Sequence, residues 1–190
     1  IELVGLYNAD ISLPLIKSTK NSKNFLTPKL SFRFNPNDMK NYTTSERTID
    51  AHNAFAINRL GLSDTLESGR SLTLGMDFKK ERKNNLEKIN NYFEFKVATV
   101  IRDKRETFIP NKSTINKKNS NLFGSVTNKL SENVKIGYDF SLDNDFNTLE
   151  YNDINTTFSI NNVVTKFNFI EENGERGDSN ILASSISYEL

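Results

Sequence analysis

The sequence predicts an all-β fold, an antiparallel meander that forms part of a transmembrane outer-membrane β-barrel. Apolar and polar residues alternate over long stretches, and successive strand side chains point to opposite faces. The clearest apolar face is Val134, Ile136, Tyr138, Phe140 and Leu142. The expected strands are mostly about 9–13 residues long, near the ~9–11 residues of a membrane-crossing strand and above the ~5–6 of a typical globular strand.

Nine strands are expected along the chain. The first, at residues 11–16, contains Pro14, which confines it to an edge position or a strand end. The others are expected at residues 28–35, 69–80, 92–102, 120–130, 134–142, 148–160, 163–170 and 180–190. Within the first long connection we expect a short helix near residues 50–60, with Asp50 as its N-cap.

The connections between these strands differ in length at the two ends of the meander. Residues 131–133 and 161–162 are tight turns, and asparagine tolerates the positive φ that such hairpins require. The long connections, residues 37–68 and 103–119, fall at the opposite end. Short turns on one rim and long loops on the other are typical of outer-membrane barrels. The charged turn at residues 79–91 is longer than this rule favours.

Composition excludes several classes of protein. The hydrophobic fraction is 36% and no stretch of ~20 apolar residues exists, which excludes a helical membrane protein. The formal net charge of +1 gives no field that would favour nucleic acid. The chain has no cysteine, which removes disulfides and thiolate sites.

The charged residues of the polar strand faces leave two environments open. These residues are Arg33, Asp77, Glu94, Lys96, Lys135, Asp139 and Lys166. In a barrel they would line a hydrated lumen. In a soluble β-sandwich they would form the solvated outer face, and the pattern is the same for both.

No constellation predicts catalysis, a metal or a cofactor. His52 is the only histidine, in a polar loop, so we expect it to be solvated rather than a metal ligand. A Ser-His-acid hydrolase is improbable for the same reason, and no glycine pattern suits phosphate binding. We therefore expect no enzyme activity.

Residues 51–75 carry a motif that alternation does not explain. A phenylalanine is followed by Asn-Arg, Gly-x-x-Asp, an acidic residue and a glycine before the next strand. The motif residues are Phe55, Asn58, Arg59, Gly61, Asp64, Glu67 and Gly69. This section resembles the LptD family of lipopolysaccharide-assembly proteins, as does the strand before it. The run from residue 119 to residue 188 is similar to the later barrel of the family, particularly its alphaproteobacterial branch.

The resemblance implies that residues 1–190 are a partial barrel of about nine strands, truncated at both ends, from a barrel of about 26 strands. It implies a transport function at the Gram-negative cell outer membrane: helping to deliver lipopolysaccharide and insert it into the outer leaflet. The implied partners are lipopolysaccharide, outer-membrane lipid, an LptE-like plug lipoprotein and, through an N-terminal jelly roll, an LptA-like periplasmic bridge. The alternatives are a general porin or autotransporter barrel, or a soluble carbohydrate-binding β-sandwich.

Overall fold

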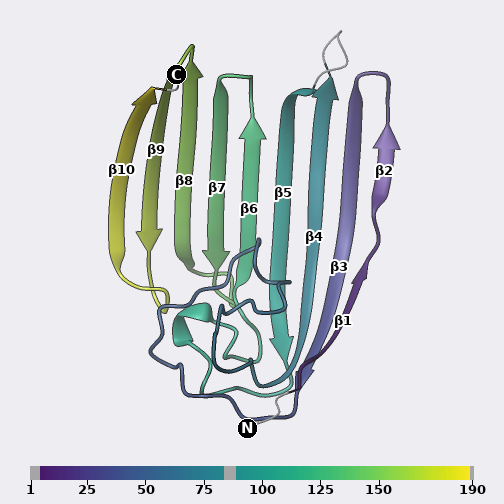
Figure 1. The fold of residues 1–190 in the computed structure, drawn as a ribbon, viewed down its shortest axis with the longest axis vertical. Coiled ribbons are helices and arrows are strands. Elements are labelled where there is room, and N and C mark those ends of the chain that lie inside the picture. Colours follow the sequence, from purple (N-terminus) through teal and green to yellow (C-terminus); the bar gives the residue numbers. More distant parts are fainter. Residues whose placement is uncertain (1–4, 84–88, 189–190) are drawn as a thin grey trace.

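The computed structural model describes residues 5–83 and 89–188, and in these residues ten strands form one antiparallel sheet (Figure 1). The elements are β1 (Tyr7–Ser12), β2 (Leu15–Ser18), β3 (Ser22–Asn35), β4 (Gly69–Lys83), β5 (Ile89–Arg102), η1 (Asn111–Ser113), β6 (Leu122–Lys129), β7 (Val134–Leu142), β8 (Leu149–Ile160), β9 (Val163–Glu172) and β10 (Ser179–Tyr188). Within the described residues, no helix has both the length and the apolar character needed to span a membrane.

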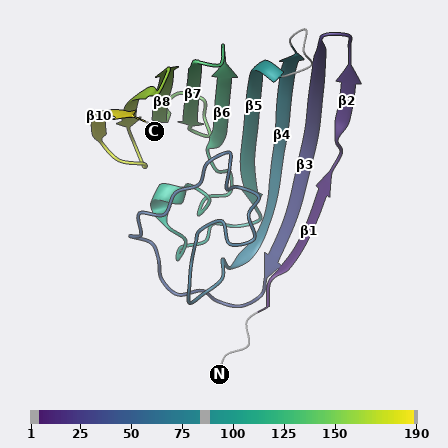
Figure 2. The ribbon, with the colours of Figure 1, turned by 45° about the horizontal axis from the view of Figure 1, so that its top comes forward.

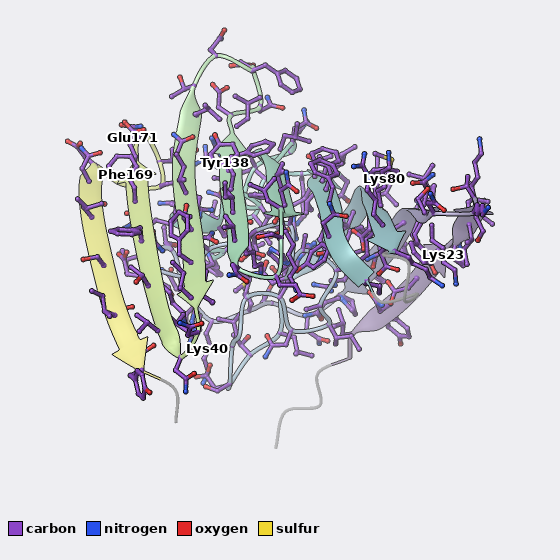
Figure 3. All side chains as sticks on the ribbon, turned by 90° about the horizontal axis from the view of Figure 1, so that it is seen from above. Lys23, Lys40, Lys80, Tyr138, Phe169 and Glu171 are labelled. Atoms are coloured by element: carbon purple, nitrogen blue, oxygen red, sulfur yellow. The ribbon has the colours of Figure 1, made fainter. Side chains whose placement is uncertain are left out.

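The sheet is a meander in which neighbours in sequence are neighbours in space. Its order is β1-β3-β4-β5-β6-β7-β8-β9-β10, and β2 extends the β1 edge by pairing with β3. The described sheet is open, with β1 and β2 at one edge and β10 at the other. Seen along the strands, it forms an arc with the long loops on its concave side (Figure 3). The all-β antiparallel meander is therefore confirmed.

Most strands lie where the alternation predicts, and the departures have local causes. The strand predicted at residues 11–16 is two strands, because the chain breaks at Leu13 and Pro14. The predicted nine strands therefore become ten in the described residues. The helix expected near residues 50–60 is wrong, since this segment consists of turns. Asp50 Oδ1 still accepts the backbone N–H groups of His52 (2.7 Å) and Asn53 (2.8 Å), but no helix follows.

The two rims of the sheet differ as expected. Short connections at residues 19–21, 130–133 and 161–162 form one rim. The connections at residues 36–68 and 103–121 form the other, together with two shorter loops (Figure 1). The turn expected at residues 79–91 is largely strand, since β4 continues to Lys83 and β5 begins at Ile89; its remainder lies outside the described residues.

Pairing in register gives the sheet two chemically different faces. Phe32, Leu72 and Ile101 stand opposite one another on what we call the outer face. Large apolar side chains on this face are open to the surroundings, with Phe32 44% and Phe167 47% exposed. The inner face is the one that carries the long loops, which lie within the curve of the sheet (Figure 2). The molecule thus leaves its apolar face uncovered.

The buried apolar core lies on the inner face. We call it the loop core, and it consists of Met39, Ile49, Ala51, Ala54, Leu60, Leu62, Ala98, Val100, Ile109, Ile115 and Phe123. Most of these side chains come from the two long loops, and the rest come from β5 and β6. Backbone hydrogen bonds also join the loops, from Tyr42 N to Phe108 O (2.9 Å) and from Asn111 N to Thr43 O (3.1 Å). The loops are therefore one packed body on the inner face.

We predict that Ile49→Ala loosens this body. Ile49 is 0% exposed, and truncating a buried isoleucine costs roughly 2–5 kcal/mol. Limited proteolysis of the intact protein should cut residues 36–68 faster in this variant. Ile57→Ala is the matched control, since Ile57 lies in the same loop and is 65% exposed. Equal acceleration in both variants would contradict the prediction.

Candidate functional site

The centre of the motif is a side-chain pair between Arg59 and Glu67. Arg59 Nε donates to Glu67 Oε2 at 2.7 Å, and a second guanidinium nitrogen donates to Oε1. The guanidinium also donates to Thr73 Oγ1 and Ser71 Oγ, both at 2.9 Å, and to the Ala54 carbonyl oxygen at 3.3 Å. Such a two-pronged contact uses the planar geometry of arginine and carboxylate. It fixes the loop to the inner face of β4.

Two more arginines converge on the same carboxylate. Arg33 of β3 donates to Glu67 Oε2 at 3.1 Å, and Arg102 at the end of β5 donates to Oε1. Arg33 also reaches the Ala56 carbonyl oxygen at 2.6 Å, and Arg102 reaches that of Ser68. We call Glu67, Arg33, Arg59 and Arg102 the Glu67 cluster. It joins the loop to strands β3, β4 and β5.

The Glu67 cluster is closed to solvent. Its arginines are 2% (Arg33), 4% (Arg59) and 4% (Arg102) exposed. Burial on its own disfavours the charged form of Glu67, but the charges and hydrogen bonds of Arg59, followed by Arg102 and Arg33, outweigh it. They hold the pKa of Glu67 well below its usual range. The carboxylate is thereby kept ionised as the acceptor that three guanidinium groups share.

Asn58 and Gly61 shape the turn that presents Arg59. Asn58 accepts from Leu62 N at 3.0 Å and donates to Leu62 O at 2.7 Å. Gly61 adopts a φ of 61°, in the left-handed region that glycine reaches without strain. These two motif residues are therefore accounted for by backbone geometry.

Phe55 anchors the other end of the motif against the sheet. Its ring lies over Gly75 of β4, where a Cβ atom would come within 2.6 Å of the ring. The Lys29 ammonium group lies 5.6 Å from the centre of the same ring. The lack of a side chain at Gly75 lets the loop approach the strand closely.

Asp64 does not join the Glu67 cluster. It lies at the surface, where Lys40 donates to its carboxylate at 2.7 Å and Tyr42 donates at 2.5 Å. The Lys40 bond, followed by that of Tyr42, lowers the pKa of Asp64. Gly69, the last motif residue, begins β4 with a φ of 80°. The motif thus divides into buried, turn and surface positions.

The register places all seven charged positions of the polar strand faces on the inner face. They are Arg33, Asp77, Glu94, Lys96, Lys135, Asp139 and Lys166. Arg33 belongs to the Glu67 cluster, whereas the other six lie apart from it. Asp77 pairs with Lys29, and Glu94 pairs with Lys79 at 3.2 Å. Lys135 and Lys166 are exposed.

His52 is less isolated than the sequence suggests. Its Nε2 lies 3.1 Å from Ser125 Oγ and 3.4 Å from Asp139 Oδ1, and Nδ1 lies 3.4 Å from Lys96 Nζ. The imidazole therefore lies over the inner face of β5, β6 and β7, with 49% of its side chain still exposed to solvent. Among the described residues, no group of three or more His, Asp or Glu side chains is arranged to hold a metal ion.

Sequence reasoning did not identify Arg102 as a site residue. It is the last residue of β5 and falls on the polar parity of that strand. Its link to Glu67 depends on register, which places Arg33, Ser71 and Arg102 in one row across three strands. The signal in the sequence is that Arg102, like Arg33, lies at a polar position near the long-loop end of its strand.

Comparison with known families assigns the chain. A family model described as LPS transport system D (LptD) matches residues 3–181. The chain belongs to the LptD family. A search of curated proteins returned no match. LptD is a transport protein that acts in lipopolysaccharide transport to the outer membrane of Gram-negative bacteria, so lipopolysaccharide is the substrate.

We predict that Glu67→Gln releases the motif loop, residues 51–68, from the sheet. The substitution leaves three buried guanidinium groups without their shared carboxylate, and breaking a buried pair costs about 3–5 kcal/mol. Hydrogen exchange of the intact protein should show lost protection in residues 51–68, because local opening sets exchange there. Asp64→Asn removes the same charge at the surface and should change exchange little. Similar losses in both variants would refute the role of the cluster.

The low pKa of Glu67 also predicts a pH dependence. A depressed folded-state pKa contributes stability that is complete above the unfolded value of about 4.3 and is lost as the pH falls towards the folded value. The protection advantage of the wild type over Glu67→Gln should therefore be constant near neutral pH and shrink below about pH 4.3. Hydrogen exchange of both proteins at matched pH measures this ratio. An advantage that does not vary down to strongly acidic pH would count against it.

Proposed function

We propose that this sheet is a section of the wall of an outer-membrane barrel, through which lipopolysaccharide is delivered to the outer leaflet. The observation that supports the proposal is that the buried core lies on the polar face of the sheet and not on its apolar face. The buried apolar cluster lies against the inner face, whereas the outer face leaves its large apolar side chains exposed. A soluble sandwich would cover that face with a second sheet. Lipid would cover it in a barrel.

The outer face has the dimensions of a membrane-spanning band. On β3 the outward apolar positions run from Leu26 to Phe34, eight residue-to-residue steps apart. At a rise of ~3.4 Å per residue this is roughly 27 Å along the strand. A tilt of about 40° reduces the height to ~21 Å, near the ~25 Å of an outer-membrane apolar band. The band therefore supports a wall that spans the hydrocarbon layer.

The inner face suits the polar part of lipopolysaccharide. Sugars and phosphates would lose hydrogen bonds in hydrocarbon, at a cost of several kcal/mol for each unpaired group. The exposed Lys135 and Lys166, and the paired Glu94 and Lys79, offer charged groups in a hydrated space. We propose that these side chains keep the path wet while the acyl chains leave into the bilayer.

We propose an architectural role for the motif loop. Its Arg59 and Glu67 side chains are closed to solvent, so they hold the loop rather than contact substrate. The loop core lies at the long-loop end of the inner face, the extracellular end in outer-membrane barrels. It would narrow the lumen there.

The remaining partners fit surfaces that the loop core leaves free. An LptE-like plug lipoprotein would occupy the inner face towards the short-turn rim, which the loops do not cover (Figure 2). The open edges at β1, β2 and β10 would pair with further barrel strands, so that residues 1–190 form a partial barrel domain. An LptA-like bridge would bind the N-terminal jelly roll of the family, which this sheet does not contain.

A photo-crosslinking pair tests this proposal. Lys135 and Ile136 are adjacent in β7 and point to opposite faces. In cells that make the intact protein, a crosslinker at position 135 should capture lipopolysaccharide or the plug lipoprotein. The same group at position 136 should capture phospholipid, because that position lies near the short-turn rim.

The outcomes separate the alternatives. Crosslinks from position 136 to a soluble protein would refute a lipid-facing outer face. Lipid contact at position 136, with neither lipopolysaccharide nor plug captured at position 135, would support a barrel wall but refute the proposed path. Equal products at both positions would refute the assignment of the two faces.

A further inference from the structure

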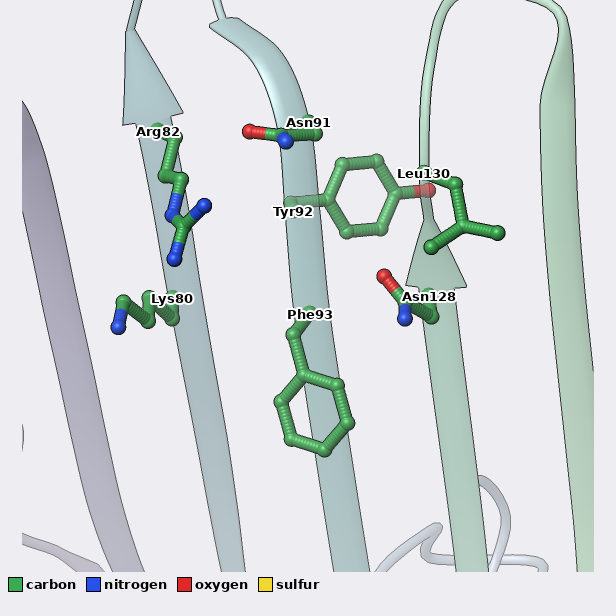
Figure 4. Close-up of a pocket in the computed structure, with 7 residues that line it drawn as sticks. All are labelled: Lys80, Arg82, Asn91, Tyr92, Phe93, Asn128 and Leu130. Carbon is green, nitrogen blue, oxygen red and sulfur yellow. The ribbon is translucent and has the colours of Figure 1, made fainter.

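A pocket on the outer face lies beside the short-turn rim (Figure 4). Its volume is about 260 Å³, and it spans β4, β5 and β6. Figure 4 views the sheet from the side opposite the long loops. It shows polar side chains towards the rim and the Phe93 ring lower in the pocket. The polar lining residues are Lys80, Arg82, Asn91, Asn128 and Tyr92.

The two cations of this pocket have no acidic partner among the described residues. Lys80 pairs across the strands with Phe93, and Arg82 pairs with Asn91. None of the described residues that line the pocket is acidic. Lys79, on the inner face at similar height, differs, since it bonds both Glu81 (2.8 Å) and Glu94 (3.2 Å). Within residues 5–83 and 89–188, no acidic side chain neutralises the positive charge of this pocket.

The pocket joins this charge to an apolar floor. The Phe93 ring lies 6.3 Å from that of Phe78, the outward residue of the next row on β4. Below them, Met76 and Val97 continue the apolar band. A ligand that fits would carry a negative headgroup at the rim and a hydrocarbon tail along the strands.

We infer that this pocket binds the headgroup phosphate of an anionic phospholipid in the leaflet at the short-turn rim. Lys80 and Arg82 would contact the phosphate, with Asn91 and Asn128 as hydrogen-bond donors and the acyl chains against Phe93 and Phe78. The inference rests on the proposed function in one respect: it requires the outer face to lie in lipid. Short turns mark the periplasmic rim of such barrels, so the leaflet is the inner one.

The experiment uses the intact protein with its plug lipoprotein, purified in detergent. Native mass spectrometry would measure retention of phosphatidylglycerol, of phosphatidylcholine and of lipid A. We expect the wild type to retain phosphatidylglycerol preferentially. Each of the substitutions Lys80→Gln and Arg82→Gln should reduce this retention about fivefold, and the double variant should combine both losses. Lys80→Arg keeps the charge and should retain the lipid.

The matched control removes two cations from the inner face. Lys23, Glu81, Tyr92 and Lys129 form one row across four strands. Lys23→Gln with Lys129→Gln therefore changes net charge equally at nearly the same height, and should retain phosphatidylglycerol. Equal retention of all three lipids, preference for lipid A, or equal loss in the control would overturn the inference.

A failure of the lipid-binding pocket can be distinguished from a failure of the proposed barrel wall. A protein that enters the membrane and shows the expected crosslinks at positions 135 and 136, but has no preference for phosphatidylglycerol, refutes only the pocket. A protein with no lipid contact at position 136 refutes the barrel wall itself.

Discussion

In-register alternation of side chains is the constraint on which the rest of this molecule depends. Every strand is paired antiparallel with its neighbour in the sheet. Alternate residues of each strand therefore supply the outer face, and the residues between them supply the inner face. The outward residues are mostly apolar, apart from groups near the rims such as Lys80 and Arg82, whereas the inner face carries the long loops and their buried apolar side chains. The faces on which the loop core and the charged strand residues lie both reflect this division.

The Glu67 cluster shows how the inner face tolerates buried charge. A lone carboxylate without solvent would be strongly unfavourable, but Glu67 meets three guanidinium groups that come from β3, β5 and the loop itself. Each arginine also bonds backbone carbonyl oxygens of the motif segment. The cluster thus links segments that are far apart in the sequence, namely β3, β5 and the loop. The loop core supplies the apolar packing around it.

The strands and their two faces could be predicted from the sequence, because the alternation of apolar and polar residues is a local pattern. β7 has the predicted bounds, and the register places the seven charged strand residues on one face of the sheet. β3 begins earlier than predicted because Ser22, Lys23 and Asn24 pair as readily as apolar residues. Arg59 and Glu67 were found through the motif, but their union with Arg102 was not, since it depends on the path of a long loop. The helix near Asp50 failed because one capping aspartate serves a turn equally well.

The row formed by Arg33, Ser71 and Arg102 has a consequence for how the wall is assembled. A slip of one residue in either pairing would carry an arginine to the opposite side of the sheet, where hydrocarbon would replace its acceptors. The loop could then not close over Glu67, and its apolar side chains would stay exposed. Closure of the loop over Glu67 therefore requires β3, β4 and β5 to stand in this one register, so the loop contacts and the strand alignment depend on each other.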